Sequence, residues 1–494
     1  MSFIDSIVAA FSPEAAYRRA AYRQAYEFLR NYDAGNYDRP NQNWRATNQS
    51  AEITDRYSRD EIKARARDLE RNSDIMNSVI GAFKRNVVSG GFSIQAKTEE
   101  PELNKELEKA WKRWCKKQNC DVTGTQSLNQ IIRMAVMRKK VDGGILFVKR
   151  YTPDGYVPFK LQMIEVDELD NSMMRSPGGA KVIGGIEYND YNKPLAYYIR
   201  RYDPEGYGLM DPVRIEAKDV IFYFTKKRPT QLREISDMAH TIPRVRDINE
   251  FMMAVAVKER IEACLSVFIK KTIPTTGIGR GNGQYPQERT SYDGKLLSPG
   301  MMKELNAGDE IQVVNPTGQA ADATSFTKLQ QRLIGAGQGI SYESTSRDMS
   351  ESTYSSARQG MIEDEMTYAE EKELLIEVLD EIYETFVISA VLCNAIVIPN
   401  FWEDKDRYLS HEWTQEPKPW IDPKKESDAN RTALSSGQKT FKQIAAESGR
   451  DWRDQIDDMA DVLEYGKEKG VDMSKIMFDM EEETDEPERN DNEE

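Results

Sequence analysis

The sequence contains little of the chemistry that metal and catalytic sites use most. Only two histidines are present, His240 and His411, and neither has a second histidine or a cysteine pair at ligand spacing. A histidine-based metal site is therefore not expected, because such a site needs several converging ligands. Isolated histidines are more typical of structural positions, and no cofactor or metal is predicted for this chain.

Cysteines are also few and scattered. The chain has four, at Cys115, Cys120, Cys264 and Cys393, and only the first two lie close together in the sequence. This spacing excludes a disulfide framework of the kind that secreted domains use, and it does not match a zinc-binding pattern. We expect a protein of a reducing, intracellular compartment.

Long hydrophobic runs are absent. The longest apolar stretch, from Phe386 to Ile398, contains Asn394 and is shorter than the roughly 20 residues that span a membrane. The N-terminal MSFIDSIVAAF carries an acid in its short apolar run, so no targeting signal is predicted. We therefore expect a soluble protein with no membrane partner.

Phosphate-binding loops and activated nucleophiles are missing too. The glycine run at 277–283 alternates strictly and does not match G-x-G-x-x-G, and the GQKT at 437–440 has the wrong order for a Walker A loop. Ser341 lies in GISYE, which lacks the final glycine of a nucleophile elbow. The acidic cluster at 363–365 lies on a predicted helix and is read as a solvated face. The sequence therefore predicts no enzyme.

Charge is abundant but unevenly distributed. Charged residues make up 31% of the chain and the net charge is -15. Ten acids and one base lie between Phe478 and Glu494, so this tail alone contributes -9 and is predicted to be disordered. The remaining body, at about -6, lacks the basic excess of a tight nucleic-acid binder.

Three basic stretches can nevertheless be interpreted in two ways. They lie at 112–117, between and beside Trp111 and Trp114, at 138–140 and at 226–228. Interleaved aromatic and basic residues can contact DNA. The alternative, which we favour, is that these faces pair with acids of a neighbouring subunit.

Hydrophobic periodicity indicates an α+β protein of two to four structural units, since 494 residues exceed one compact core. Short β-rich runs separated by turn residues alternate between 144 and 224, and apolar pairs at intervals of four form one stripe from 374 to 391. Helices are predicted at 17–30, 59–88, 101–118, 128–140, 244–270, 324–336, 356–392 and 423–470.

Several segments, taken in order, resemble the lambda-type portal family of tailed bacteriophages. They include RDLERNSDIMNSVIGAFKRNVVSGGFSIQA, RIEAKDVIFYFTKKRPTQLREIS, the stretch from Phe326 to Glu343, DMSESTYSSAR and ALSSGQKTFKQIAAESGRDW. The resemblance covers about 60–480, and its strength lies in the ordered set rather than in any single motif. One departure is Glu234, where the family usually has glycine, which puts a local turn in doubt.

The resemblance implies a portal fold with an α/β wing, a long-helix stem, a small α/β clip and a helical C-terminal crown. The expected divisions are an N-terminal arm (1–50), wing (51–236), stem helix (237–265), clip (266–323), second stem helix (324–340), tunnel loop (341–357), wing long helix and return strand (358–422), crown (423–478) and acidic disordered tail (479–494).

The same resemblance implies site residues. The tunnel loop would contact DNA through Ser344, Thr345, Ser346, Arg347 and Asp348, where Arg347 beside Asp348 would give weak, reversible contact with phosphates. An ordinary loop between subunits is the alternative. The clip loop would dock the motor and the adaptor through Gly277, Gly279, Arg280, Gly281 and Gly283.

The implied function is a homo-oligomeric ring, usually a dodecamer, at a unique capsid vertex of the virion. Double-stranded DNA would pass through it during packaging and ejection. The ring would initiate head assembly in the host cytoplasm, contact the major capsid and scaffold proteins, and dock the terminase large subunit and later the head–tail adaptor. Twelve helices about 10 Å wide would leave a bore of roughly 28 Å, enough for a duplex. The alternatives are another structural virion protein, such as a minor capsid or adaptor protein, and a packaging nuclease or ATPase.

Overall fold

The computed structural model divides the chain into two compact units, Met1–Thr54 and Asp55–Glu494, each of which is described by itself. Few residues of the first unit are described, so the predicted arm and its helix at 17–30 lie largely outside them. The described residues are 12–15, 17–18, 21–22, 48–173, 175–203, 205, 208, 210–264, 268–269, 303–304, 320–415, 423–471 and 473.

The predicted helix at 59–88 is broken at Ser73. Helix α4 (Arg59–Asn72) ends before Ser73, whose side chain accepts a hydrogen bond from Met76 N and so caps α5 (Asp74–Phe83). The chain then continues as a short π-helix, η2 (Lys84–Val88), and leaves it at Ser89, whose φ is 50°. The wider π-helical turn and the strained residue after it were not predicted from the sequence.

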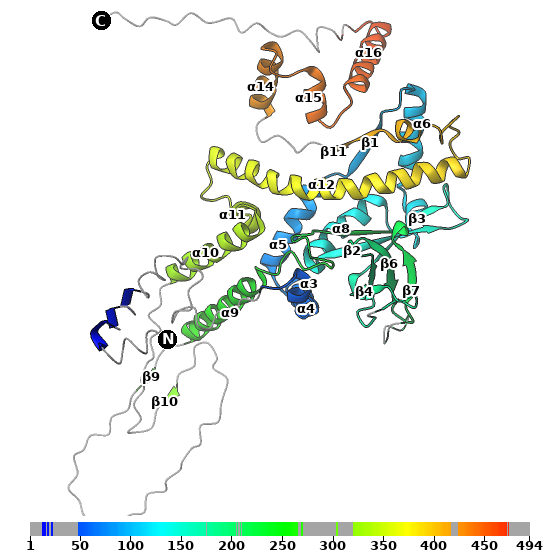
Figure 1. The fold of residues 1–494 in the computed structure, drawn as a ribbon. Helices are drawn as coiled ribbons and strands as arrows, with labels where there is room; N and C mark the ends of the chain where they lie inside the picture. The colour runs from blue at the N-terminus through cyan, green and yellow to red at the C-terminus, as the bar shows by residue number, and fades with distance from the viewer. Residues whose placement is uncertain are drawn as a thin grey trace, which may run out of the picture. The chain divides into compact units, whose positions relative to one another are not determined.

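The mixed α/β region is built around one long helix, α12 (Tyr354–Leu392), which runs along a three-stranded antiparallel sheet (Figure 1). The predicted apolar stripe of α12 is confirmed, because its residues from Leu375 to Ala390 at this spacing are buried in the main core. Facing aromatic rings, such as Trp111 against Phe386 at 5.2 Å, pack α6 onto this helix. The elements of this layer are α6 (Pro101–Trp114), α7 (Lys117–Cys120), α8 (Leu128–Asp142), β2 (Gly144–Tyr151), β3 (Phe159–Ile164) and β8 (Val220–Phe224).

A second antiparallel sheet, of four strands in the order β4-β5-β6-β7, packs on its own smaller core. The predicted run VIGGIEY forms a tight hairpin, since Gly184 and Gly185 both have positive φ. Strand β7 was missed because its four residues, VRIE, have only one buried side chain. The strands are β4 (Lys181–Ile183), β5 (Ile186–Tyr188), β6 (Pro194–Ile199) and β7 (Val213–Glu216).

Glu234, which stands where the family usually has glycine, forms a buried ion pair with Arg233. Arg233 and Glu234 are both 0% exposed, and the guanidinium donates to the carboxylate at 2.7 and 2.9 Å. Arg233 also donates to Asn171 Oδ1 at 2.8 Å and to the carbonyl oxygens of Gly184 and Val166. The charged pair therefore joins the hairpin of the second sheet to the segment that leads toward α9 (Ile242–Cys264).

Two short strands far apart in the sequence close the other side of α12. Strand β1 (Phe92–Ala96) pairs antiparallel with β11 (His411–Gln415), which follows α13 (Lys405–Leu409). Trp413 of β11 donates its indole N–H to Asp380 of α12 at 2.6 Å. The return segment predicted after the long helix is thus a strand that is held against that helix.

The long helices predicted for the stem are α9 (Ile242–Cys264) and α10 (Ala320–Gln338), and they pack against each other. The prediction that the first continues to Lys270 is wrong, because Phe268 and Ile269 form strand β9, which pairs in parallel with β10 (Lys303–Glu304). These two short strands are nearly all that is described of the expected clip. The structure does not test the other domain boundaries.

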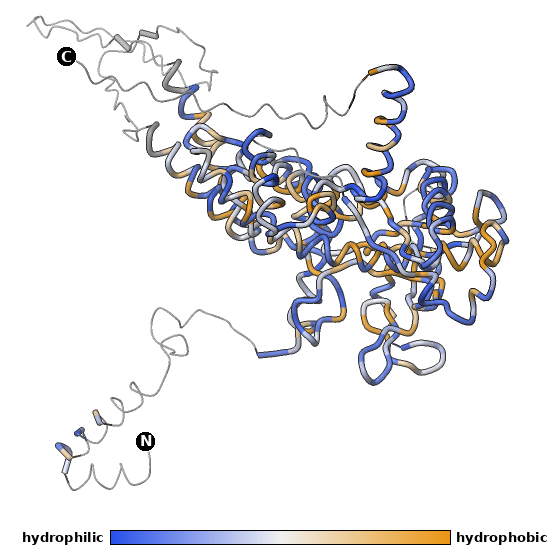
Figure 2. Tube along the Cα trace, turned by 90° about the horizontal axis from the view of Figure 1, so that it is seen from above, coloured by the Kyte–Doolittle hydropathy of each residue, from blue (hydrophilic) through white to orange (hydrophobic). Residues whose placement is uncertain are grey.

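The C-terminal region is helical, as predicted, with α14 (Pro423–Ser435), α15 (Phe441–Glu447) and α16 (Trp452–Glu468). Thr440 and Gln443 form a capping box at the start of α15. Hydrophobic and hydrophilic residues alternate along the helices (Figure 2), and among the described helices none is both long and apolar enough for a membrane crossing. The predicted acidic tail lies outside the described residues.

Candidate functional site

Gly335, in the last turn of α10, and Gly339, just after this helix, have little room for a side chain. Gly339 has a φ of 70°, which favours glycine, and its carbonyl oxygen accepts from Thr367 Oγ1 at 2.6 Å. A Cβ on Gly335 would lie 2.7 Å from both Ile340 O and Thr345 Oγ1. The chain can therefore fold back closely onto the end of α10 before it reaches the predicted tunnel loop.

A short helix, α11 (Tyr342–Ser346), occupies the first part of that loop and is tied to α12 by one buried carboxylate. Asp364 accepts from the backbone N–H of Ser341 at 2.6 Å, from Ser341 Oγ at 2.9 Å, and from the hydroxyl of Ser344. The acidic cluster at 363–365 was predicted to be a solvated face. That prediction is wrong for Asp364, which is buried and anchors the loop.

The five residues expected to contact DNA have different environments. Ser344 donates to Asp364, Thr345 is 1% exposed, and the hydroxyl of Ser346 donates to the carbonyl of Tyr342. Asp348 accepts from Ser350 and from the Tyr342 hydroxyl, which lowers the pKa of its carboxyl. Arg347 is exposed at the left-handed C-terminal position of α11. The predicted DNA contact is therefore best carried by Arg347, and it stays a prediction.

The loop also lies beside the π-helical segment. Helix α11 packs on α5, and Tyr368 of α12 sits edge-on to Phe83 at 5.4 Å. Burial raises the pKa of Tyr368 to about 12. Burial is the main cause that lowers the pKa of Arg85, and the nearby positive charge of Arg347 adds to it. Two guanidinium groups from distant parts of the sequence are thus close together.

Two of the predicted basic stretches contribute to a buried charge cluster inside one chain. Lys139 Nζ lies 2.5 Å from Glu371 and 3.1 Å from Asp237, and Lys140 Nζ lies 2.6 Å from Glu371. Lys227 also reaches Asp237, at 3.2 Å. We had favoured acids of a neighbouring subunit as partners. That prediction is wrong for these three lysines, whose partners are in the same chain.

The third basic stretch does not form a stacking surface, because Trp111 and Trp114 are buried in the core. Lys112, in the last turn of α6, and Lys116, which precedes α7, are exposed. Neither side chain makes an ion pair with any residue that the structure describes.

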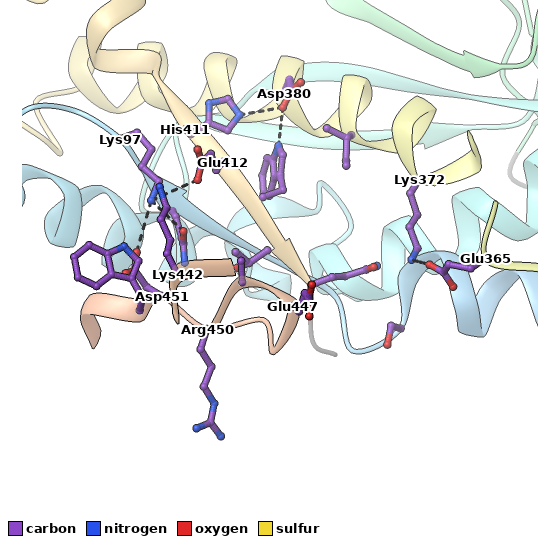
Figure 3. Close-up of a pocket in the computed structure, with 18 residues that line it drawn as sticks. Lys97, Glu365, Lys372, Asp380, His411, Glu412, Lys442, Glu447, Arg450 and Asp451 are labelled. Carbon is purple, nitrogen blue, oxygen red and sulfur yellow. Dashed lines mark hydrogen bonds and ion pairs between the residues drawn. The ribbon is translucent and has the colours of Figure 1, made fainter. Parts of the chain in front are cut away.

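A groove of about 670 Å³ lies between the β1–β11 pair, α12 and the C-terminal helices (Figure 3). Its charged side chains are largely engaged with one another: Lys97 reaches Glu412 and Asp451, and Lys372 reaches Glu365. The groove is thus a polar junction that holds the C-terminal helices to the β1–β11 pair.

Both histidines have structural partners. In the groove, His411 bridges Asp380, at 3.0 Å, and the carbonyl oxygen of Leu409, at 2.7 Å. His240 contacts the carbonyl oxygen of Gly337 on α10. Within the described part of the chain, no three histidine, cysteine or acidic residues are arranged to hold a metal ion. The glycines and Arg280 predicted for motor and adaptor docking lie outside the described residues.

Comparison with known proteins places this architecture in a family. Residues 37–372, more than half of the chain, match the family described as "Phage portal protein, lambda family". The chain belongs to the lambda family of phage portal proteins. Its fold class and its function as a portal protein, both predicted from the ordered motifs, are therefore confirmed at this level.

Three portal proteins illustrate the relationship. The probable portal protein of Halomonas phage phiHAP-1 is 24% identical over 431 residues, covering 83% of this chain and 81% of that protein. Portal protein B of Escherichia phage lambda is 20% identical and covers 79% and 81% of the two chains. The portal protein of Escherichia phage N15 is 19% identical and covers 83% and 85%.

Among solved structures, chains from gene transfer agent particles are similar. One from the virion of a native particle covers 77% of this chain and 92% of its own, with 11% identity and a TM-score of 0.39. One from the neck of a native particle covers 79% and 96%, with 13% identity and the same TM-score of 0.39.

Proposed function

We propose that this portal protein assembles into a ring of twelve copies at a unique vertex of the capsid and that double-stranded DNA passes through its centre. Membership in the portal family supports this proposal most directly. In this arrangement α9 and α10 form the stem, the α/β region forms the wing, and α14 to α16 form the crown. The ring assembles in the host cytoplasm and becomes part of the virion.

An exposed apolar surface on the stem helices supports assembly with further copies. Met253 and Val257, one turn apart on α9, are 71% and 51% exposed, and Leu329 and Leu333 have the same spacing on α10. The two helices contact each other through other residues, including Phe251 and Phe326 at 4.6 Å. Exposed apolar stripes on both helices fit a surface that another copy of the same stem covers.

Substitution of this surface tests the assembly. We expect the double variant Met253→Asp, Val257→Asp to remain folded and to lose ring formation, since burying two unpaired carboxylates between subunits is strongly unfavourable. Circular dichroism and native mass spectrometry measure the fold and the copy number. Tyr191→Asp is the matched control, because Tyr191 is exposed on a turn of the four-stranded sheet. Rings of normal mass from the double variant would exclude the stem helices as the interface.

We further propose that the segment at 266–323 docks the terminase large subunit and later the head–tail adaptor, with Arg280 and its flanking glycines as contacts. The major capsid and scaffold proteins are the remaining partners, since the ring initiates head assembly. The portal family is structural, and in this proposal a separate motor supplies ATP hydrolysis. Hydrolysis of ATP or magnesium-dependent DNA cleavage by the purified ring would contradict that division of labour.

A further inference from the structure

A small pocket beside the tunnel loop is lined by cations and has no acidic residue in its lining. Its volume is about 560 Å³. It lies between the end of α5, the π-helix η2 and α8. Its lining residues, called here the cation pocket, are Lys84, Arg85, Ser89, Gln130, Arg133, Met134 and Met137.

The three cations of the pocket have no counter-charge. Lys84, Arg85 and Arg133 make no ion pair with any described residue, although the net charge of the chain is -15. Other half-buried cations of the α/β region are paired, as Arg67 is with Asp142 and Arg138 is with Glu70. Three unpaired cations that share a pocket repel one another, so a bound anion would stabilise the arrangement.

The local backbone holds these side chains in place. Arg133 Nη2 donates to the carbonyl oxygen of Ser89 at 2.8 Å, which ties α8 to the strained residue that ends the π-helix. Lys84 and Arg85 follow directly on α5, so the π-helical turn determines where they project. Arg133 and Lys84 are half-buried, whereas Arg85 is exposed at the mouth of the pocket.

The predicted tunnel loop lies beside the helix that leads into the pocket, because α11 packs on α5. Arg347, at the C-terminal end of α11, adds a fourth cation whose charge helps to lower the pKa of Arg85, and it too lacks an ion pair among the residues described. The acid on the adjoining helix, Asp364, is occupied by Ser341 and Ser344. The cations of the pocket and Arg347, called here the basic surface, therefore come from η2, α8 and α11, three elements that all pack on α5.

We propose that the cation pocket and Arg347 bind phosphate groups of the DNA backbone, so that part of the wing, as well as the loop, contacts the passing duplex. The inference rests on the proposed function as a DNA conduit. Guanidinium groups suit phosphate oxygens because they donate two parallel hydrogen bonds. Contact with phosphates alone carries no sequence information, so binding is independent of DNA sequence.

The test compares two charge-matched double variants of the full-length ring. Lys84→Gln, Arg85→Gln removes two cations of the pocket that make no structural hydrogen bond in the described chain, and Lys112→Gln, Lys116→Gln removes two exposed cations at the end of α6 and just after it. Native mass spectrometry first establishes the assembly of each protein. Fluorescence anisotropy then measures binding of two labelled duplexes of different base composition as a function of salt concentration.

We expect wild-type rings to bind both duplexes equally at low salt. The Lys84→Gln, Arg85→Gln variant should bind about tenfold more weakly or worse, with a slope of log affinity against log salt that is smaller by about two. The Lys112→Gln, Lys116→Gln variant should retain at least half of the wild-type affinity. This pattern supports the pocket as a phosphate site.

Other outcomes overturn the proposal. Equal losses in the two variants would indicate general charge attraction, and unchanged binding by the pocket variant, or no binding by wild-type rings, would exclude a phosphate site. Loss of ring assembly in the pocket variant alone would indicate that the cations pair with acids of a neighbouring copy. Failure of the conduit itself is distinguishable, because it appears as absence of wild-type rings before any DNA is added.

Discussion

Arg233 and Glu234 form a buried pair whose effect on stability differs from that of surface ion pairs. Both side chains are completely buried. Arg233 also donates hydrogen bonds to oxygen atoms of Asn171, Gly184 and Val166. Burial of a charged pair need not stabilise a fold relative to apolar residues. Removal of one partner, however, leaves the other charge without compensation in the core.

We therefore predict that Arg233→Met lowers the free energy of unfolding by about 3 to 5 kcal/mol, as measured by urea denaturation. The control Arg246→Met removes an exposed pair with Asp247 and should leave the free energy of unfolding nearly unchanged, because exposed ion pairs contribute little to stability. Arg233→Met combined with Glu234→Leu should recover part of the loss. Equal effects of the two single variants would contradict the assigned role of the buried pair.

Asp237 links stability to pH. Burial alone would raise the pKa of its carboxyl, but Lys139, Lys140 and Lys227 outweigh burial, so its pKa lies below the usual value. The unfolded chain therefore binds the proton more readily than the folded chain. The stabilisation by this carboxylate is complete above the unfolded pKa of about 3.9 and is lost as pH falls through the folded pKa.

We predict that Asp237→Asn is less stable than wild type at pH 7, by about 3 kcal/mol, and that the difference shrinks below about pH 4. Thermal or urea unfolding across this pH range measures both quantities. Asp68→Asn, an exposed change on α4, is the control. A difference that stays constant down to the lowest pH would show that the carboxylate is not charged in the folded chain.

At the scale of single elements, α11 depends on α12 for its position. Asp364 is the shared acceptor of two residues at the start of α11, including the backbone N–H of Ser341. We predict that Asp364→Ala lowers the local unfolding free energy of residues 341–346 by about 2 kcal/mol, because hydrogen bonds to a carboxylate are lost. Hydrogen exchange of the Ser344 and Thr345 amides measures this change.

The neighbouring change Glu363→Ala provides the control, since Glu363 is exposed one position earlier on the same helix. It should leave exchange in α11 nearly unchanged. If both variants increase exchange equally, the effect belongs to the helix as a whole and not to the carboxylate of Asp364.

The sequence predicted the elements more completely than the contacts between them. The stripe on α12 and six of the seven strands of the two larger sheets, all except β7, have local patterns, so they were predictable. The pairing of Lys139 with Glu371 joins residues 232 apart in the chain, and no local pattern indicates it. The same holds for Asp364, whose cluster is typical of a solvated helix face.

The basic surface was only partly predictable for a related reason. Arg347 was identified through the family resemblance, but Arg85 and Arg133 belong to no basic run and come together only through packing of α5 and α8. Conversely, the conspicuous run at 138–140 is paired inside the chain. A search for unpaired cations therefore requires the folded chain.

For the whole molecule, the acidic body and the local basic surface have opposite effects on how strongly a DNA duplex is bound. A net charge of -15 disfavours tight retention of a duplex, whereas a few cations in each subunit give weak contacts that repeat around a ring. The apolar stripes of α9 and α10 are exposed in the single chain, and in the proposed ring a neighbouring copy covers them.

Native mass spectrometry of the purified protein, combined with negative-stain images of the same sample, tests the central claim most directly. We predict a closed ring of twelve copies whose axial hole admits a DNA duplex of about 20 Å diameter. Monomers, open sheets or a ring too narrow for a duplex would contradict the proposed conduit.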